Sequence, residues 1–315
     1  MKSRGGLRRG IGVALTVGVL ASVSVQAPAL ATHPGTNGKI AFWVFNKGQV
    51  KAVEPDGSGR ILIAGDSLVA GSGPFRDPAW SPDGTQIAYV ANKSLMVASA
   101  DGTNATEIAG SGSGVEFGWL VSPSWSGDGT QIAVLSHIKG TEGGRVTIVS
   151  VADGSLTQIG PHKATDYNGL DWSPTGSIAF LTGFSSTLHL IQPDGSGSSV
   201  IDGNYLFDPS WSPDGSRLAV SRYLGRVQGG RQRTDIMTMD ADGSGRQWVT
   251  STPKRWEWTP AFSPDGSMIA YSRTQTRDDL AFDDIWMVGV DGSGAHRITD
   301  TPNIDEFGLD WQPLP

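Results

Sequence analysis

The chain has 315 residues, among them 43 glycines, 18 prolines and 11 tryptophans, and it contains no cysteine. The lack of cysteine excludes disulfide bonds, thiolate metal ligands and a lipid-modified N-terminal cysteine. The formal net charge of −7 argues against nucleic acid and anionic membrane surfaces as partners. So many glycines and prolines favour short strands joined by turns over long helices.

The first 31 residues have the pattern of a secretory signal peptide. A basic stretch over residues 2–9 precedes an apolar stretch over residues 11–25, and the small residues Ala29 and Ala31 follow. The apolar stretch is short and contains glycine and serine, which favours a signal peptide over a membrane anchor. We therefore expect cleavage after Ala31, export to the periplasm or the exterior, and a single mature domain over residues 32–315 without a membrane anchor.

A stretch of fourteen residues recurs along the mature chain. The sequence DPAWSPDGTQIAYV starts at Asp77 and returns in altered form at Ser122, Asp208 and Thr259. The Ser-Pro-Asp-Gly segment suits a tight turn, because proline presets φ, aspartate tolerates the next position and glycine accepts a left-handed one. Each copy therefore predicts a hairpin of two strands, here named a and b.

A second hairpin follows each copy. It is built on an Asp-Gly turn flanked by apolar strands, which we name c and d. The six Asp-Gly turns begin at Asp56, Asp101, Asp153, Asp194, Asp242 and Asp291. The aromatic residues that end strand a are Trp80, Trp125, Trp172, Trp211, Phe262 and Trp311. Six four-stranded units at this period predict an all-β, six-bladed β-propeller of antiparallel blades, with these aromatic residues packed between blades.

The two ends of the mature chain predict how the ring closes. NGKIAFW, from Asn37, matches strand b, and FGLDWQPLP, from Phe307, matches strand a. We therefore expect one blade to be shared between the two termini, which removes its open edges. Four units carry proline two residues before the aromatic residue, and because proline cannot donate to a ladder, strand a is predicted as the innermost edge strand.

The repeat PxWSPDGxxIAY followed by DGSG resembles that of TolB-like β-propellers over about Gly35 to Pro313. Such propellers also occur beside the catalytic domains of prolyl-oligopeptidase-type enzymes. The resemblance implies a scaffold that binds a protein or peptide on one face of the propeller, sometimes with a calcium ion at its axis. The family's periplasmic namesake carries a separate N-terminal domain, for which the residues between Thr32 and Asn37 leave no room.

The connections between strands d and a are the candidate binding site. They share one face with the b–c connections, and each contains an acidic and an aromatic residue. The acidic residues are Asp77, Glu116, Asp166, Asp208, Glu257, Asp305 and Glu306. The aromatic residues include Phe75, Phe117, Trp119, Tyr167, Tyr205, Phe207, Trp256, Trp258 and Phe307. A ring of carboxylates would attract a cation or a basic partner segment, and exposed aromatics would anchor an interface. The alternative is a solvated acidic rim with aromatics that cap the blades.

Two functions remain open from the sequence. The chain has no nucleophile elbow, phosphate-binding loop or zinc-protease motif, which favours a non-catalytic, monomeric scaffold for a protein or peptide of the cell envelope. The alternative is a carbohydrate-active hydrolase or lyase that uses carboxylates in the propeller mouth. Glu116, Asp166 and Glu257 are its candidates, since such an enzyme needs two carboxylates about 5–10 Å apart in one cleft.

Overall fold

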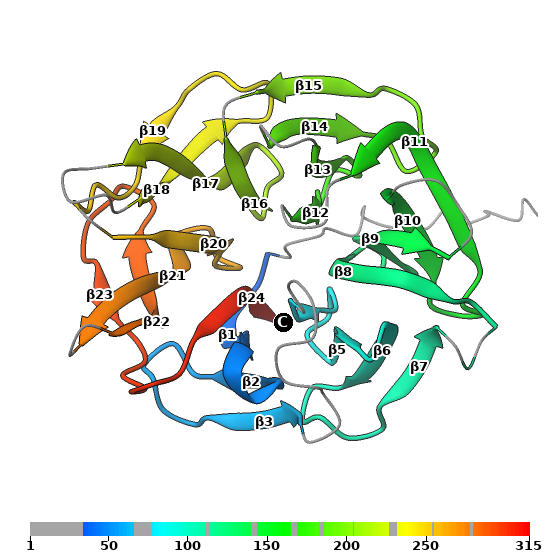
Figure 1. Cartoon of the computed structure of the whole chain (residues 1–315), viewed down its shortest axis with the longest axis horizontal. Helices are drawn as coiled ribbons and strands as arrows, with labels where there is room; N and C mark the ends of the chain where they lie inside the picture. The colour runs from blue at the N-terminus through cyan, green and yellow to red at the C-terminus, as the bar shows by residue number, and fades with distance from the viewer. Residues whose placement is uncertain are drawn as a thin grey trace, which may run out of the picture.

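The computed structural model describes residues 34–65, 77–110, 112, 114–139, 144–164, 169–182, 186–203, 205–226, 232–253, 255–277 and 280–315. These residues form a ring of six four-stranded antiparallel blades, which confirms the predicted all-β propeller (Figure 1). Helical structure among them is short, as in the 3₁₀ turn Phe45–Lys47. Across these ranges, therefore, no helix is long and apolar enough to cross a bilayer.

The four strands of each blade are given from the innermost strand outward. Blade 1 contains β4 (Ala79–Trp80), β5 (Gln86–Ala91), β6 (Ser94–Ser99) and β7 (Thr106–Ala109). Blade 2 contains β8 (Phe117–Trp125), β9 (Gln131–Ile138), β10 (Gly144–Ser150) and β11 (Leu156–Ala164). Blade 3 contains β12 (Leu170–Trp172), β13 (Ile178–Thr182), β14 (Thr187–Ile191) and β15 (Ser199–Asp202).

The remaining blades follow the same order. Blade 4 contains β16 (Leu206–Trp211), β17 (Arg217–Arg226), β18 (Gln232–Asp240) and β19 (Gln247–Trp248). Blade 5 contains β20 (Glu257–Phe262), β21 (Met268–Arg277), β22 (Leu280–Gly289) and β23 (His296–Arg297). Blade 6 contains β24 (Glu306–Leu314), β1 (Thr36–Val44), β2 (Gln49–Val53) and β3 (Ile61–Ala64).

Blade 6 closes the ring without a covalent link, as the sequence predicts. Its innermost strand β24 is C-terminal and pairs antiparallel with β1, which lies beside it in Figure 1. The pairing extends from Thr36 opposite Leu314 to Val44 opposite Glu306. The indole Nε1 of Trp311 also donates to the carbonyl of Gly38 at 3.0 Å.

The Ser-Pro-Asp-Gly turns are held by their own side chains. In blade 1, the Asp83 carboxylate accepts from the Ser81 hydroxyl at 2.7 Å and from the Thr85 amide at 3.0 Å. The Gly84 amide donates to the Ser81 carbonyl at 2.9 Å, with φ of 66° at the glycine. Because these bonds are local, the same residue pattern recreates the turn in each repeat.

The aromatic residue at the end of each innermost strand packs against the preceding blade. All six are at most 4% exposed. Trp125 of blade 2 lies in one apolar cluster with Val90 and Val97 of blade 1, and its indole donates to the carbonyl of Ala79 at 3.0 Å. These side chains are therefore core residues between blades, in agreement with the prediction.

The innermost strands bend at a repeated bulge, which we call the axial bulge. In β8, Val121 pairs with Leu135 while Ser124 pairs with Ala133, so two residues face one on β9. The first of the two, Ser122, has a left-handed φ of 51°. The same register shift occurs in β16, β20 and β24. Its left-handed residues there are Asp208, Thr259 and Gly308, with φ of 49°, 47° and 58°.

The axial bulge explains the prolines of strand a more fully than an edge position does. Proline occupies the second bulge position in β8, β16 and β20, where no ladder hydrogen bond is required of its nitrogen. The left-handed residue before it is strained when it carries a side chain, most of all the β-branched Thr259. The bulge directs that side chain toward the propeller axis, where the candidate site lies.

Candidate functional site

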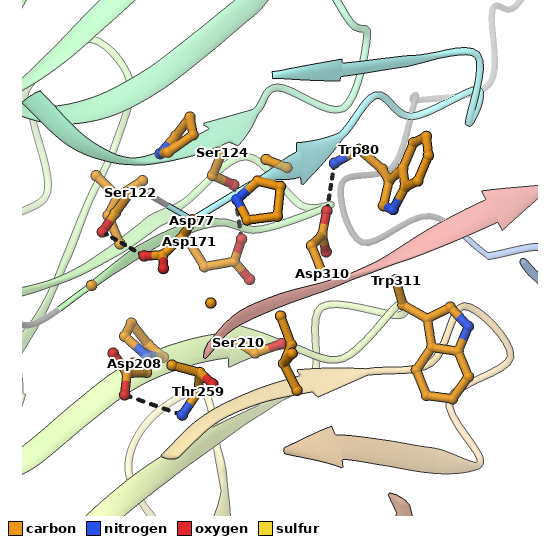
Figure 2. Close-up of a pocket in the computed structure, with 18 of the residues that line it drawn as sticks. Asp77, Trp80, Ser122, Ser124, Asp171, Asp208, Ser210, Thr259, Asp310 and Trp311 are labelled. Atoms are coloured by element: carbon orange, nitrogen blue, oxygen red, sulfur yellow. Dashed lines mark hydrogen bonds between the residues drawn. The ribbon is translucent and has the colours of Figure 1, made fainter. Parts of the chain in front are cut away.

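The six innermost strands surround a pocket on the propeller axis, with a cavity volume of about 90 Å³ (Figure 2). The residues three places before each aromatic residue form its outer layer: Asp77, Ser122, Gly169, Asp208, Thr259 and Gly308. The residues one place before it form an inner layer, of which Ala79, Ser124, Asp171, Ser210 and Asp310 line the pocket. The pocket therefore has four carboxylates in its wall.

The two layers repeat every three blades. The outer layer reads Asp, Ser, Gly in blades 1–3 and Asp, Thr, Gly in blades 4–6, while the inner layer has its aspartates in blades 3 and 6. Blades three places apart lie on opposite sides of a six-membered ring. Asp77 is therefore opposite Asp208 in the outer layer, and Asp171 is opposite Asp310 in the inner one.

The inner aspartates link neighbouring blades. Asp171 accepts from the Ser124 hydroxyl at 2.8 Å and from the backbone amide of Trp211 at 2.7 Å. Asp310 accepts from the backbone amide of Trp80 at 2.5 Å, and Figure 2 shows this bond across the ends of β24 and β4. These amides lie on edge strands and have no ladder partner on that side, so the carboxylates satisfy them.

Serine performs the same task at two other blade junctions. The Ser124 hydroxyl accepts from the amide of Trp172 at 3.0 Å, and the Ser210 hydroxyl accepts from the amide of Phe262 at 3.2 Å. The inner layer thus ties each of four blades to the next one. We infer that its polar residues hold the ring together around the pocket.

The outer aspartates have fewer partners. Asp77 accepts from the Ser122 hydroxyl at 3.3 Å, and its Oδ1 atom is buried without a hydrogen-bond partner. Asp208 accepts from the Thr259 amide at 3.2 Å. A Cβ atom on Gly308 would lie 2.0 Å from Asp77 Oδ1, so the glycine leaves the space that this carboxylate occupies.

Enclosure by protein makes ionisation of the four carboxyls unfavourable, although each keeps contact with the space inside the pocket. Burial raises the pKa of Asp77 and of Asp171 to about 6. Burial and the nearby Asp77 raise the pKa of Asp208 to about 7. Burial, with a smaller contribution from Asp171, raises the pKa of Asp310 to about 8. A cation in the pocket would stabilise the ionised forms.

The donor set does not fit a calcium ion held by several carboxylates. Calcium takes six to eight oxygen ligands. Nowhere in the described residues do three or more acidic or histidine side chains come close enough to share one metal ion. Asp171 also uses both carboxylate oxygens on Ser124 and Trp211. The expected calcium ion at the axis thus remains a prediction that this geometry does not support.

The acidic residues predicted at the mouth separate into different environments. Asp77 and Asp208 line the axial pocket. Glu116 is exposed and forms a 3.0 Å ion pair with Lys139. Asp305 is partly buried, which raises its pKa. Asp166, with Tyr167 and Phe75, lies outside the described residues.

Glu257 and Glu306 require a correction, because both side chains are fully buried inside the blades. Glu257 accepts from the Thr250 hydroxyl, which itself accepts from the Ile236 amide at 2.9 Å. In the same way, the Glu306 carboxylate accepts from the Thr299 hydroxyl. Its Oε1 atom lies 3.3 Å from Nη1 of Arg60. Both carboxylates belong to the links between the outermost strand of one blade and the next blade, so neither is available to a partner.

Five aromatic residues lie near the start of the innermost strands of blades 4 and 5, as one pair and one group of three, and we call them together the aromatic cluster. The ring centroids of Tyr205 and Tyr223 are 6.1 Å apart, those of Phe207 and Trp258 are 6.0 Å apart, and those of Trp256 and Trp258 are 5.3 Å apart. All three pairs are edge-to-face. Tyr205 is 52% exposed and Trp256 is 37% exposed.

The other predicted aromatic residues are not part of this cluster. Phe117 is buried in the core between blades 1 and 2. Trp119 stacks on His137 with ring centroids 6.3 Å apart. Phe307 meets the exposed ring of Phe45 edge-to-face at the same separation. Phe117 therefore fills the space between two blades, whereas Trp119 and Phe307 pack within their own blades, in line with the alternative of aromatics that cap the blades.

The sequence reasoning missed Asp171 and Asp310. Both occur in the segment Leu-Asp-Trp, which replaces the Pro-Ala-Trp or Pro-Ser-Trp of other repeats. The same two repeats have glycine where the others have aspartate, serine or threonine in the outer layer. Aligning the residues directly before the aromatic position would have shown an acidic pair three blades apart.

Gly308→Ala tests the contact between the bulge and Asp77. Alanine at a left-handed position costs about 1–2 kcal/mol from backbone strain alone. Gly294→Ala is the matched control, since Gly294 has φ of 67° and open space around its Cβ position. We expect Gly308→Ala to destabilise more than the control in urea unfolding. In a double-mutant cycle, adding Asp77→Ala should remove the extra loss of unfolding free energy caused by Gly308→Ala. If the effects of the two substitutions simply add, the contact is contradicted.

Asp310→Asn tests the buried inner carboxyl. Because the pKa of Asp310 is raised to about 8, its contribution to stability is present below about pH 4 and lost as the pH rises through about 8. Asparagine does not titrate and can still accept from Trp80. The unfolding free energy of the variant relative to the parent should rise by more than about 1 kcal/mol from pH 4.5 to 8.5. A constant difference would contradict the raised pKa.

Asp56→Asn is the control for that pH series. Hydrogen bonds from Ser58 lower the pKa of the exposed Asp56, so it is ionised in both folded and unfolded chains across this range. Its difference from the parent should stay flat over the same pH window.

Known proteins share both the repeat and the fold. The chain is 32% identical over 114 residues to the Tol-Pal system protein TolB of Anaeromyxobacter dehalogenans, which covers 36% of this chain and 24% of the relative. The chain thus spans about a quarter of the length of the curated relatives it matches. TolB from Acinetobacter baumannii superposes with a TM-score of 0.68 at 18% identity, over 88% of this chain and 67% of that one.

A second solved structure has the same architecture. The putative TolB from Agrobacterium tumefaciens superposes with a TM-score of 0.61 at 16% identity, over 89% of this chain and 99% of that one. At these identities the superpositions establish the fold alone. The family model of the TolB β-propeller domain matches residues 49–304. With six blades and the repeat in each, this chain belongs to the TolB β-propeller family.

Proposed function

We propose that this protein is an exported, non-catalytic scaffold that binds a protein or peptide partner of the cell envelope. The partner would lie on the face formed by the d–a and b–c connections. The aromatic cluster carries the proposal, because tyrosine and tryptophan are the residues that most often anchor protein interfaces. Its exposed members, Tyr205 and Trp256, come from two adjacent blades, and Trp256 packs edge-to-face on Trp258.

The cluster opens onto the same end of the propeller as the outer layer of the axial pocket. Tyr205 precedes Asp208 by three residues, and Trp256 precedes Thr259 by three residues. A strand rises about 3.3 Å per residue, so the exposed rings lie about 10 Å along the strand from the pocket. A partner on the cluster can therefore reach the axis.

The family supports a partner in the cell envelope. Three of the curated relatives are named Tol-Pal system protein TolB, and the resemblance implies a propeller that binds protein on one face. The signal-peptide pattern of residues 1–31 supports export, although these residues lie outside the described ranges. We further propose that the mature domain acts as a monomer.

No observation favours the carbohydrate-active alternative. Of its three candidate carboxylates, Glu116 is on the surface in an ion pair and Glu257 is buried within a blade. These two do not share a cleft, and Asp166 lies outside the described residues. The axial pocket does hold carboxylates of raised pKa, but about 90 Å³ is small for a glycan substrate.

Affinity capture from a host envelope extract tests the scaffold proposal. The baits are the mature domain, the double variant Tyr205→Ala/Trp256→Ala, and the control Trp248→Ala. Trp248 is also 49% exposed but lies on the outermost strand β19 of blade 4. We expect the parent and the control to retain one protein, identified by mass spectrometry. The double variant should retain at least about tenfold less of that protein, because interface anchors contribute this much to affinity.

Two results would count against the proposal. Equal retention by all three folded baits would remove the aromatic cluster as the binding surface. No specific protein on the parent bait would remove the scaffold function itself. Circular dichroism melts of each bait establish that the variants are folded.

A further inference from the structure

We propose that the axial pocket receives one arginine side chain of the partner, held between Asp77 and Asp208. The inference rests on the proposed function, since the arginine would belong to the segment that covers the aromatic cluster. It specifies the chemistry of that segment, which must place a guanidinium group on the propeller axis.

Asp77 differs from the inner aspartates in its unused hydrogen-bonding capacity. Asp171 is satisfied on both oxygens, and Asp310 is held by the Trp80 amide at 2.5 Å. Asp77 has one 3.3 Å bond and a buried Oδ1 atom without any partner. Asp208 has one 3.2 Å bond. A buried carboxylate oxygen left unpaired is costly, and a cationic donor removes that cost.

The positions of the outer pair suit a planar, forked donor. The two carboxylates lie on opposite sides of the ring, one from each three-blade half, and Figure 2 shows them on separate walls of the pocket. A guanidinium carries five N–H donors in a fixed plane, so it can bond one carboxylate on each side. A compact metal ion would instead need its ligands gathered at one point, and no such group exists in the described chain.

The rest of the pocket wall is compatible with a cation. β8 and β20 contribute the hydroxyl groups of Ser122 and Thr259. At the same level lie Gly169, directly before β12, and Gly308 of β24. The charged groups below them are the inner carboxyls described above. The pocket lining contains no lysine, arginine or histidine, so nothing in the lining itself neutralises the outer pair.

Access is from the end of the propeller that carries the aromatic cluster. Tyr205 and Trp256 come directly before β16 and β20, the strands that supply Asp208 and Thr259 to the outer layer. The separation of about 10 Å along the strand is spanned by an extended arginine side chain and a short piece of its backbone. One segment can thus contact the rings and fill the pocket together.

Binding should depend on pH, because the guanidinium requires ionised carboxylates. Burial raises the pKa of Asp77 to about 6, and burial together with the nearby Asp77 raises the pKa of Asp208 to about 7. A bound cation lowers both pKa values. At a pH between 6 and 7, binding therefore releases protons from the two carboxyl groups. Affinity therefore rises as the pH increases from 5.5 to 8.

The test uses a small probe and the folded mature domain. Nα-acetyl-arginine amide is titrated at pH 8 by NMR chemical shift and by calorimetry, beside the neutral Nα-acetyl-citrulline amide and calcium chloride. The variants are Asp77→Asn and Asp208→Asn, with Glu116→Gln as the control for a carboxylate outside the pocket. Proton release at pH 6.5 is measured by calorimetry in two buffers of different ionisation enthalpy. This measurement uses the parent protein alone, so it remains valid if a variant fails to fold.

We expect saturable arginine binding that weakens at least tenfold in either Asp variant and at least tenfold from pH 8 to pH 5.5, with proton release. The control variant should bind like the parent. Equal binding of the citrulline probe, unchanged binding by the Asp variants, calcium binding in place of arginine, or no proton release would each overturn the inference. The probe contains no partner, so its failure is distinct from a failed capture on the aromatic cluster.

Discussion

The left-handed residue of the axial bulge determines what the propeller presents at its centre. In β8, β16, β20 and β24 this residue leaves the ladder with φ between 47° and 58°, and in the first three strands its side chain lines the axial pocket. Three of the four carry a side chain and so accept backbone strain, which is uncommon for serine or aspartate and rarer for threonine. The strain places hydroxyl and carboxyl groups at one level around the axis. In a regular strand, the same side chains would point to the two faces of the sheet.

The carboxylates around the axis form an inner pair and an outer pair. Asp171 and Asp310 accept backbone amides from the next blade, so they bind the ring together. Asp77 and Asp208 lie one layer further out and have little hydrogen bonding of their own. The inner pair comes from blades 3 and 6, and the outer pair comes from blades 1 and 4. The pocket therefore consists of two similar three-blade halves. Both layers link neighbouring blades, because Asp208 also accepts the backbone amide of Thr259 from the next blade.

The repeat sequence was sufficient to predict the blades and their closure, because the turns that define them are held by bonds between residues at most five positions apart. Ser81, Asp83 and Thr85 show this locality. The site was harder to predict, because its contacts cross blades. Asp171 acts on an amide forty residues later, and Glu257 was assigned to a loop although β20 begins there and Thr250 covers it. The aromatic cluster was within reach, since Tyr205, Trp256 and Trp258 were predicted by their place before strand a.

Site-specific photo-crosslinking in an envelope extract tests the central claim, that the partner lies on the aromatic face, most directly. A photoreactive residue would replace Tyr205 on that face, or Thr103 in the exposed turn between β6 and β7 on the opposite face. We predict one crosslinked protein from position 205 and none from position 103. Crosslinks from position 103 alone, or the absence of any product at position 205, would contradict the account.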